Sequence, residues 1–281
     1  MRAVARPGPG SRRGSGRWVW GLSGLVTAAV LGVPLAHLIT GVGDPQNAYA
    51  RPQHVVTRTE TVAQPVTSLV VDSYGGQVQV ASGPVSRVQV TETIMYDQHA
   101  RTPAVMQSVS DGRLALSSRA CASADCTVDF RMIVPPGVTA TVSTGGGPVT
   151  VSGTAGTNVD SAGGSLVLRG VAGPLHADTG GGNLVGQDLA APTATITTGG
   201  GDATVVFSAA PKSVKLSTDG GTAVLAVPGG PYAVTADSGG GPESLGIATD
   251  PAARPTLTVS SGGGPLRIEP APRLWWPGLS A

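Results

Sequence analysis

Two hydrophobic patterns divide the chain. Residues 18–41 form one apolar run without a charged side chain, whereas from about residue 66 onwards apolar and polar residues alternate in short runs. About 20 apolar residues are enough for a helix to cross a bilayer. Short alternating runs bounded by turn residues are typical of β-strands. The pattern therefore predicts one N-terminal transmembrane helix followed by an all-β region.

The alternating region becomes periodic from Gly137. Each unit is a strand-like run, a hydroxyl or acidic residue, a Gly-Gly or Gly-Gly-Gly tract and a second strand-like run, as in TVSTGGGPVTVSG. Gly75-Gly76 resembles an earlier, outlying copy. The last glycines of the seven regular tracts are Gly147, Gly164, Gly182, Gly201, Gly221, Gly241 and Gly264. They recur about every 20 residues, and two strands per such period are typical of a β-solenoid, in which coils stack to bury their inner faces.

The fold predicted for this region is a β-solenoid with short parallel strands and Gly-rich corners, preceded by a short region of ordinary strands. An antiparallel β-sandwich or meander, with a hairpin across each Gly tract, is the alternative. Glycine suits a corner because it permits positive φ and lets backbones approach closely. The acidic or hydroxyl residues before the tracts are expected to cap the turn backbone; they include Ser143, Asp160, Asp178, Thr197 and Asp237.

These patterns predict five parts of the chain. They are a cytoplasmic Arg-rich tail (1–17), a transmembrane helix (18–41), a linker (42–65), a β-solenoid domain (66–269, with the repeats over 137–269) and a C-terminal cap or tail (270–281). In the last part, Trp275 and Trp276 are expected to cover the open end of the last coil, which would otherwise expose strand edges.

Charge predicts the orientation of the chain. Five arginines and no acidic residue precede residue 18, so the N-terminus should stay in the cytoplasm and the β region should lie outside it. Cleavage after Ala50, in the sequence Ala-Tyr-Ala, would instead release a secreted protein. Without these arginines the chain carries 13 basic and 17 acidic residues, a net charge of −4. An acidic body without a basic stripe argues against nucleic-acid binding.

The two cysteines, Cys121 and Cys126, lie close together in RACASADC. In an oxidising compartment they are expected to form a local structural disulfide. A metal site would need more ligands nearby, so neither a metal nor another cofactor is expected.

Residues 130–153, FRMIVPPGVTATVSTGGGPVTVSG, resemble the start of the repeats in the bacterial putative-adhesin family of the DUF4097 type. The resemblance covers about residues 66–269 and implies a β-helical, surface-exposed domain without established catalytic residues. The chain departs from the family where GGGP and GGGN stand in place of Gly-Asp; only Asp202 follows the family pattern.

Several motifs permit a catalytic interpretation. Asp178-Thr179-Gly180 and Asp237-Ser238-Gly239 match the triplet of aspartic proteases, whose chemistry needs two carboxylates that share a proton. The repeat alone already explains both triplets. A β-helix polysaccharide lyase would use Arg169 or Arg267 beside clustered carboxylates, and no such cluster is visible in the sequence. Incidental cation binding along one edge remains open for four carboxylates, Asp160, Asp178, Asp219 and Asp237.

The sequence thus favours a membrane-anchored, extracytoplasmic, adhesin-like protein without catalysis, whose ligand is an unidentified glycan or protein of the cell envelope. The alternatives are a polysaccharide-active β-helix enzyme and a membrane-bound sensor or regulator.

Overall fold

The computed structural model describes residues 53–97, 104–118 and 126–272. Within these ranges the chain is built of β-strands and turns, and no helix there is long and apolar enough to cross a membrane. The predicted tail (1–17) and transmembrane helix (18–41) lie outside the described residues, as do Cys121 and the Trp275-Trp276 pair.

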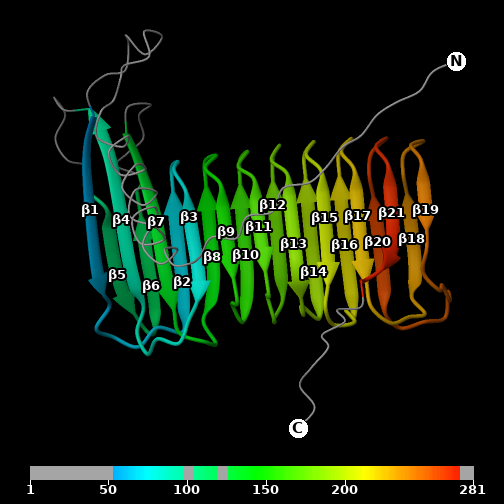
Figure 1. Ribbon diagram of the computed structural model, residues 1–281, viewed down its shortest axis with the longest axis horizontal. Coiled ribbons are helices and arrows are strands. Elements are labelled where there is room, and N and C mark those ends of the chain that lie inside the picture. Colours follow the sequence, from blue (N-terminus) through cyan, green and yellow to red (C-terminus); the bar gives the residue numbers. More distant parts are fainter. Residues whose placement is uncertain (1–52, 98–103, 119–125, 273–281) are drawn as a thin grey trace, which may run out of the picture. The chain divides into compact units, whose positions relative to one another are not determined.

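The strands form two sheets (Figure 1). Sheet A has eleven strands, in the spatial order β1 (Gln53–Thr61), β4 (Gln89–Asp97), β7 (Cys126–Val134), β3 (Val78–Ser82), β9 (Val149–Ser152), β11 (Leu166–Arg169), β13 (Leu184–Leu189), β15 (Ala203–Phe207), β17 (Ala223–Val227), β21 (Leu266–Pro270) and β19 (Glu243–Leu245). Sheet B has ten strands, in the order β18 (Ala233–Asp237), β20 (Thr256–Ser260), β16 (Ser213–Thr218), β14 (Thr193–Thr198), β12 (Leu175–Thr179), β10 (Gly156–Ser161), β8 (Thr139–Thr144), β2 (Ser68–Ser73), β6 (Arg113–Ser117) and β5 (Met106–Ser110).

Each repeat is one coil that joins the two sheets. Its first strand lies in sheet B, the chain turns at the Gly tract, and its second strand lies in sheet A, as in β8–β9 and β10–β11. Neighbouring coils pair in parallel, for example β10 with β12 and β11 with β13. The predicted parallel stacking of coils is therefore confirmed. The hairpin alternative is wrong, because the strands on either side of a Gly tract belong to different sheets. Among the strands that the structure describes, antiparallel pairs join only β1, β4 and β7, and β5 with β6.

At both ends of the stack the order in space differs from the order along the chain. The coil β2–β3, which contains Gly75-Gly76, lies between β8–β9 and the outer strands β6 and β7. The coil β20–β21 lies between β16–β17 and β18–β19. At the C-terminal end of the stack, the sixth regular repeat and not the seventh is therefore outermost. Tyr232, which is 1% exposed, packs at this end and donates a hydrogen bond to the Pro228 carbonyl at 2.5 Å.

One domain boundary also differs from the prediction. Strand β1 begins at Gln53, inside the range 42–65 that the sequence assigned to a linker. The strand is the edge of sheet A, and most of its side chains on both faces are exposed. Such a strand needs no alternation of apolar and polar residues, so its polar sequence resembles a tether.

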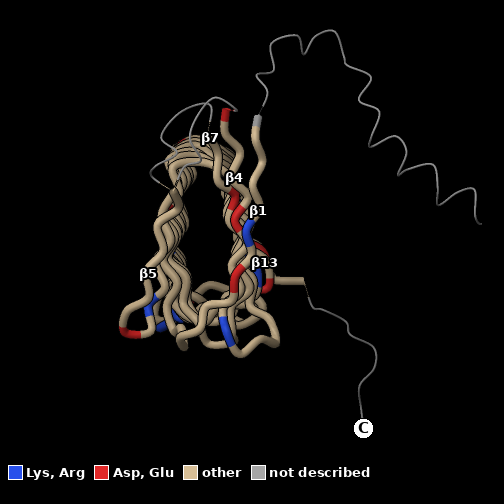
Figure 2. The backbone as a smooth tube through the Cα atoms, turned by 90° about the vertical axis from the view of Figure 1, so that its left-hand side faces the viewer, with Lys and Arg blue, Asp and Glu red and all other residues tan. Residues whose placement is uncertain are grey.

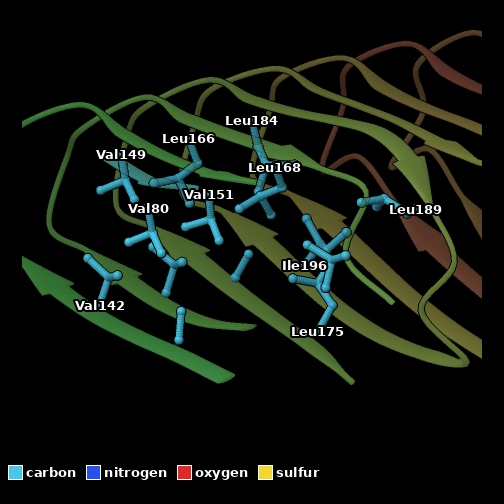
Figure 3. Packing of buried hydrophobic residues seen from close by; sticks show 14 of the residues in the cluster. Val80, Val142, Val149, Val151, Leu166, Leu168, Leu175, Leu184, Leu189 and Ile196 are labelled. Carbon is cyan, nitrogen blue, oxygen red and sulfur yellow. The ribbon is translucent and has the colours of Figure 1, made fainter. Parts of the chain in front are cut away.

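The core fills the space between the sheets. Inward-pointing side chains such as Val151 and Leu168 from sheet A meet Val142 and Ile196 from sheet B (Figure 3). The core is mainly aliphatic, since the chain has only two phenylalanines. The strands of neighbouring coils lie about 4.8 Å apart. The inward-pointing side chain of one coil therefore lies next to the equivalent, usually apolar, side chain of the following coil.

Candidate binding surface

A row of buried hydroxyl groups lies beneath the Gly corners. These residues, the inner hydroxyl row, are Ser73, Thr144, Ser161, Thr179, Thr198, Thr218, Ser261 and Ser238, and all are buried. Their hydroxyls bond to the corner backbone. Thr179 Oγ1 accepts from the Gly182 amide at 3.1 Å and donates to the Gly164 carbonyl of the neighbouring coil at 2.9 Å. The row thus satisfies backbone groups that the sharp turn leaves inside the protein.

This arrangement corrects the predicted caps. The residues expected to cap the turns stand one position earlier and lie on the outer face of sheet B, because successive side chains of a strand point to opposite faces. Of them, Asp237 does accept a corner hydrogen bond, from the Gly239 amide to Oδ1 at 2.9 Å. Elsewhere the following Ser or Thr bonds to the corner, as Ser161 Oγ does by accepting from the Gly164 amide at 2.8 Å.

The last glycines of the tracts stack directly on one another. A Cβ atom added to Gly164 would lie 2.1 Å from the Gly147 carbonyl oxygen, and one added to Gly182 would lie 2.1 Å from that of Gly164. None of the seven last glycines has a positive φ. Of the two reasons predicted for glycine, close backbone approach therefore explains these positions. Positive φ occurs instead at other glycines of some tracts, such as Gly220 (φ 103°).

The outer face of sheet B carries two continuous rows of polar side chains. The first outer row is Asp72, Ser143, Asp160, Asp178, Thr197, Ser217, Ser260 and Asp237. The second outer row runs through Thr141, Asn158, His176, Thr195, Lys215, Thr258 and Thr235. Neighbouring members are about 4.8 Å apart. In the view along the stack, acidic and basic residues are seen on the strands near β1 and β4 and at the turns below (Figure 2). The face is a regular polar grid in which half of the first outer row is aspartate and the second outer row carries one lysine, Lys215.

The four carboxylates considered for cation binding fall into two places. Asp160 and Asp178 are direct neighbours on paired strands. Asp219 and Asp237 line a groove of about 460 Å³ together with Ser217 and Ser260. Among the residues that the structure describes, no three His, Cys, Asp or Glu side chains come together in a way that could hold a metal ion.

The structure also separates the residues of the catalytic interpretations. Asp178 in β12 and Asp237 in β18 lie four strands apart, which is about 19 Å at the spacing of a sheet. They therefore cannot share a proton. Arg169 and Arg267 are likewise four strands apart in sheet A, and Arg169 Nε donates to Gln187 Oε1 at 2.9 Å.

One acidic side chain points into the protein at the N-terminal end of the stack. Glu92 in β4 is 9% exposed and lies on the inward face with Arg58 and Glu60 of β1. Burial raises the pKa of the Glu92 carboxyl, the charge of Glu60 raises it further, and Arg58 opposes both. Glu60 is itself held by Gln107 of β5, whose Nε2 donates to Glu60 Oε1. Arg58 and Glu60 are themselves exposed, at the edge of sheet A.

A shallow pit, not predicted from the sequence, lies on the outer face of sheet B where β8, β10 and β12 begin. It has a volume of about 360 Å³ and is lined by residues that include Thr139, Thr141, Gly156, Asn158 and His176. No binding role was predicted from the sequence for His176, Gly156 or Asn158. The pit becomes visible once the register places Gly156 beside Thr139, since a glycine in an outward position leaves a gap in the row.

The predicted disulfide stays a prediction. Cys126 begins β7 and is half-buried, while Cys121 lies outside the described residues. Along the chain, Cys121 comes between β6 and β7.

Comparisons with known proteins show the fold. No protein-family model matches the chain, and no curated protein does. A crystal structure described as a putative adhesin from Bacteroides fragilis has a TM-score of 0.50 and 14% identity, over 76% of this chain and 97% of that one. A putative adhesin from Parabacteroides distasonis has a TM-score of 0.45 at 14% identity, over 76% and 97% of the two chains. A putative lipid binding protein from the same species has a TM-score of 0.38 at 11% identity, over 75% and 96%. The expected resemblance to putative adhesins is thus confirmed at the level of the fold.

Proposed function

We propose that the chain is an extracytoplasmic, adhesin-like β-repeat protein that binds through the outer face of sheet B and has no catalytic role. The observation that carries this proposal is the pair of outer rows, in which coil after coil presents hydroxyl, amide or carboxylate groups at one spacing. Such a face offers many similar weak contacts to a large repetitive ligand. Linked weak contacts add to a high avidity, as adhesion to an envelope glycan or protein requires.

A non-catalytic role is supported by how the titratable groups are distributed. Acid–base chemistry needs groups within hydrogen-bond reach of one reacting atom. The two aspartates of the protease-like triplets, Asp178 and Asp237, are instead four strands apart in sheet B, and Arg169 and Arg267 are four strands apart in sheet A. The names of the structural neighbours, adhesins and a lipid binding protein, also describe binding and not catalysis.

We further propose a single-pass membrane anchor at residues 18–41 with the N-terminus in the cytoplasm. This proposal rests on the uncharged apolar run and the arginines before it. The linker would then be shorter than the sequence suggested, since β1 begins at Gln53. Cleavage after Ala50 would also leave β1 whole, so the anchored and the released form would carry the same fold.

Adhesion is tested with beads coated with the full chain and applied to immobilised bacterial envelopes. Thr195→Lys with Ser217→Lys puts bulky charges on the outer face of sheet B, and Thr204→Lys on the outer face of sheet A is the matched control. We expect bead retention to fall several-fold for the first variant and not for the control. Equal retention of both variants, or no retention of the unaltered protein, would refute binding through sheet B.

The anchor is tested by membrane fractionation and by mass spectrometry of the protein from its own host. We expect the intact chain in the membrane fraction, with the β domain open to protease added outside the cell. A soluble product of residues 51–281 would replace the anchor by a cleaved signal.

A further inference from the structure

The pit on sheet B contains a buried acceptor without a partner. Asn158 lines the pit, and its Oδ1 is the one buried side-chain polar atom in the described part of the chain that has no hydrogen-bond partner. The Nδ2 of the same amide donates to Asp160 Oδ2 at 3.3 Å. Turning the amide over would set its oxygen against the carboxylate, so Asp160 fixes the amide orientation. The Oδ1 acceptor has no donor within the part of the protein that the structure describes, and a buried acceptor without one costs about 1–3 kcal/mol.

The walls of the pit are mainly carbon. A Cβ atom built on Gly156 would lie 3.5 Å from the Pro174 carbonyl oxygen, 3.6 Å from the Thr139 methyl group and 3.8 Å from Pro174 Cδ, so two of the three nearest atoms around the gap that this glycine leaves are carbon. The volume of about 360 Å³ is far above the roughly 30 Å³ share of one water molecule. It falls at the lower end of the range of ligand pockets, about 300–1,000 Å³. The pit has room for one small ring.

The polar groups at the pit determine which charge a bound ring can carry. No Lys or Arg lines it, and the carboxylate of Asp160 stands next to it, bonded to Asn158 and 3.8 Å from His176 Nε2. A phosphate, sulfate or carboxylate ligand would be repelled. One carboxylate is too few for a tightly held metal ion, since Ca²⁺ takes about 6–8 oxygen ligands. Thr141 and His176 can each donate and accept hydrogen bonds, which suits hydroxyl groups, whereas the Thr139 hydroxyl donates to the Thr67 carbonyl at 3.5 Å.

We propose that this pit binds one ring of a neutral saccharide, with a ring hydroxyl donating to Asn158 Oδ1 and the C–H face of the ring packed on the Thr139 methyl and Pro174. The inference rests on the proposed adhesin-like function and names the ligand class for one place on the binding face. The regular rows around the pit then serve as neighbouring contacts for a longer glycan.

The test is saturation-transfer NMR and calorimetry of the full chain with methyl glycosides of glucose, galactose, mannose and N-acetylglucosamine, and with glucuronate as the charged comparison. We expect at least one neutral glycoside to bind and glucuronate to bind at least tenfold more weakly. Asn158→Ala should weaken binding of that glycoside at least tenfold, because it removes the unpartnered acceptor. Gly156→Ala should weaken it as well, because its methyl group fits the gap at ordinary contact distances and fills part of the pit. Thr204→Ala on sheet A, the control, should bind within twofold of the unaltered chain.

Melting temperatures of all three variants show that loss of binding is not loss of folding. Unchanged affinity for the glycoside in the folded Asn158→Ala variant would overturn the proposal that the pit binds a saccharide. So would the absence of any glycoside binding, which would mean that the pit holds water only. If coated beads still adhere to envelopes in either case, the proposed adhesin-like function stands and only the proposed saccharide site in the pit is rejected. If the unaltered protein neither adheres nor binds a glycoside, both fail.

Discussion

Replacing the last glycine of one tract should destabilise the protein far more than replacing the glycine before it. In Gly182→Ala the new Cβ would lie 2.1 Å from the Gly164 oxygen, 2.5 Å from the Gly164 carbonyl carbon and 2.8 Å from the Ser165 amide nitrogen. Real Cβ contacts begin at about 3.0–3.4 Å, so the two coils must move apart by about 1 Å at this corner. Gly181 lies next to it, has no atom within 4 Å of an added Cβ and does not have a positive φ.

The size of the effect follows from the bonds at the corner. A movement of about 1 Å would lengthen the bond from Thr179 Oγ1 to the Gly164 carbonyl, now 2.9 Å, and the bond from the Leu166 amide to the Asn183 carbonyl, now 2.8 Å, beyond bonding distance. Two lost hydrogen bonds cost about 1 kcal/mol each. Forcing extra volume into a packed site adds about 1–3 kcal/mol. We therefore expect the free energy of unfolding to fall by about 3–5 kcal/mol in Gly182→Ala.

The matched variant Gly181→Ala should be neutral or more stable by about 0.4–1 kcal/mol, since alanine restricts the unfolded chain without strain in the folded one. Urea unfolding followed by circular dichroism measures both variants. The reasoning is refuted if the two variants differ by less than about 1 kcal/mol, because close backbone approach would then not be what requires glycine.

Three further predictions concern the interior and the ends of the stack. Thr179→Val should lower the melting temperature by several degrees, because it leaves the Gly164 carbonyl and the Gly182 amide without their bonds, while Thr179→Ser keeps the hydroxyl and should lose less; a valine variant as stable as the serine variant would contradict this. Glu92→Gln should stabilise the protein near neutral pH and lose this advantage as the pH falls toward about 4.5. The reason is that the pKa of Glu92 is raised in the folded state, so the cost of ionising its carboxyl grows as the pH rises. Urea titrations at several pH values measure the difference in the free energy of unfolding, and a difference that does not vary with pH would indicate a packing effect instead. Reduction of the predicted Cys121–Cys126 disulfide should lower the free energy of unfolding by about 2 kcal/mol, with a Cys121→Ser, Cys126→Ser double variant insensitive to reductant as the control; no change on reduction, with both thiols reactive beforehand, would show that the bond is absent.

The repeat architecture could be predicted from the sequence because the period itself carries the information. A Gly tract about every 20 residues, with a strand-like run on each side, is the pattern expected when coils stack in parallel. The caps were placed one residue too early for a specific reason. In pairs such as Asp178-Thr179 and Thr197-Thr198 both residues are polar, so hydrophobicity does not show which of them points inward. The burial of Thr179 and Thr198, both 0% exposed, decides it only after the register is known.

The ends of the stack and the pit depend on contacts between distant segments. Nothing in the spacing of the last two tracts indicates that β20–β21 lies inside β18–β19, because both coils have the same pattern. Gly156 is likewise one of 42 glycines, and only its pairing with Thr139 distinguishes it as an outward gap. Strand β1 was missed since an edge strand exposed on both faces lacks an apolar period.

The position of β20–β21 also bears on how the chain is made. A ribosome or a secretion channel delivers residues 233–245 before residues 256–270, yet the later segment must lie between the earlier one and the rest of the stack. The edges of β16 and β17 therefore have no final partner until the last coil has emerged. Unpaired edges are where β proteins associate wrongly. The finished end thus closes only after synthesis has passed residue 270, and a chain stopped earlier retains an edge open to other chains.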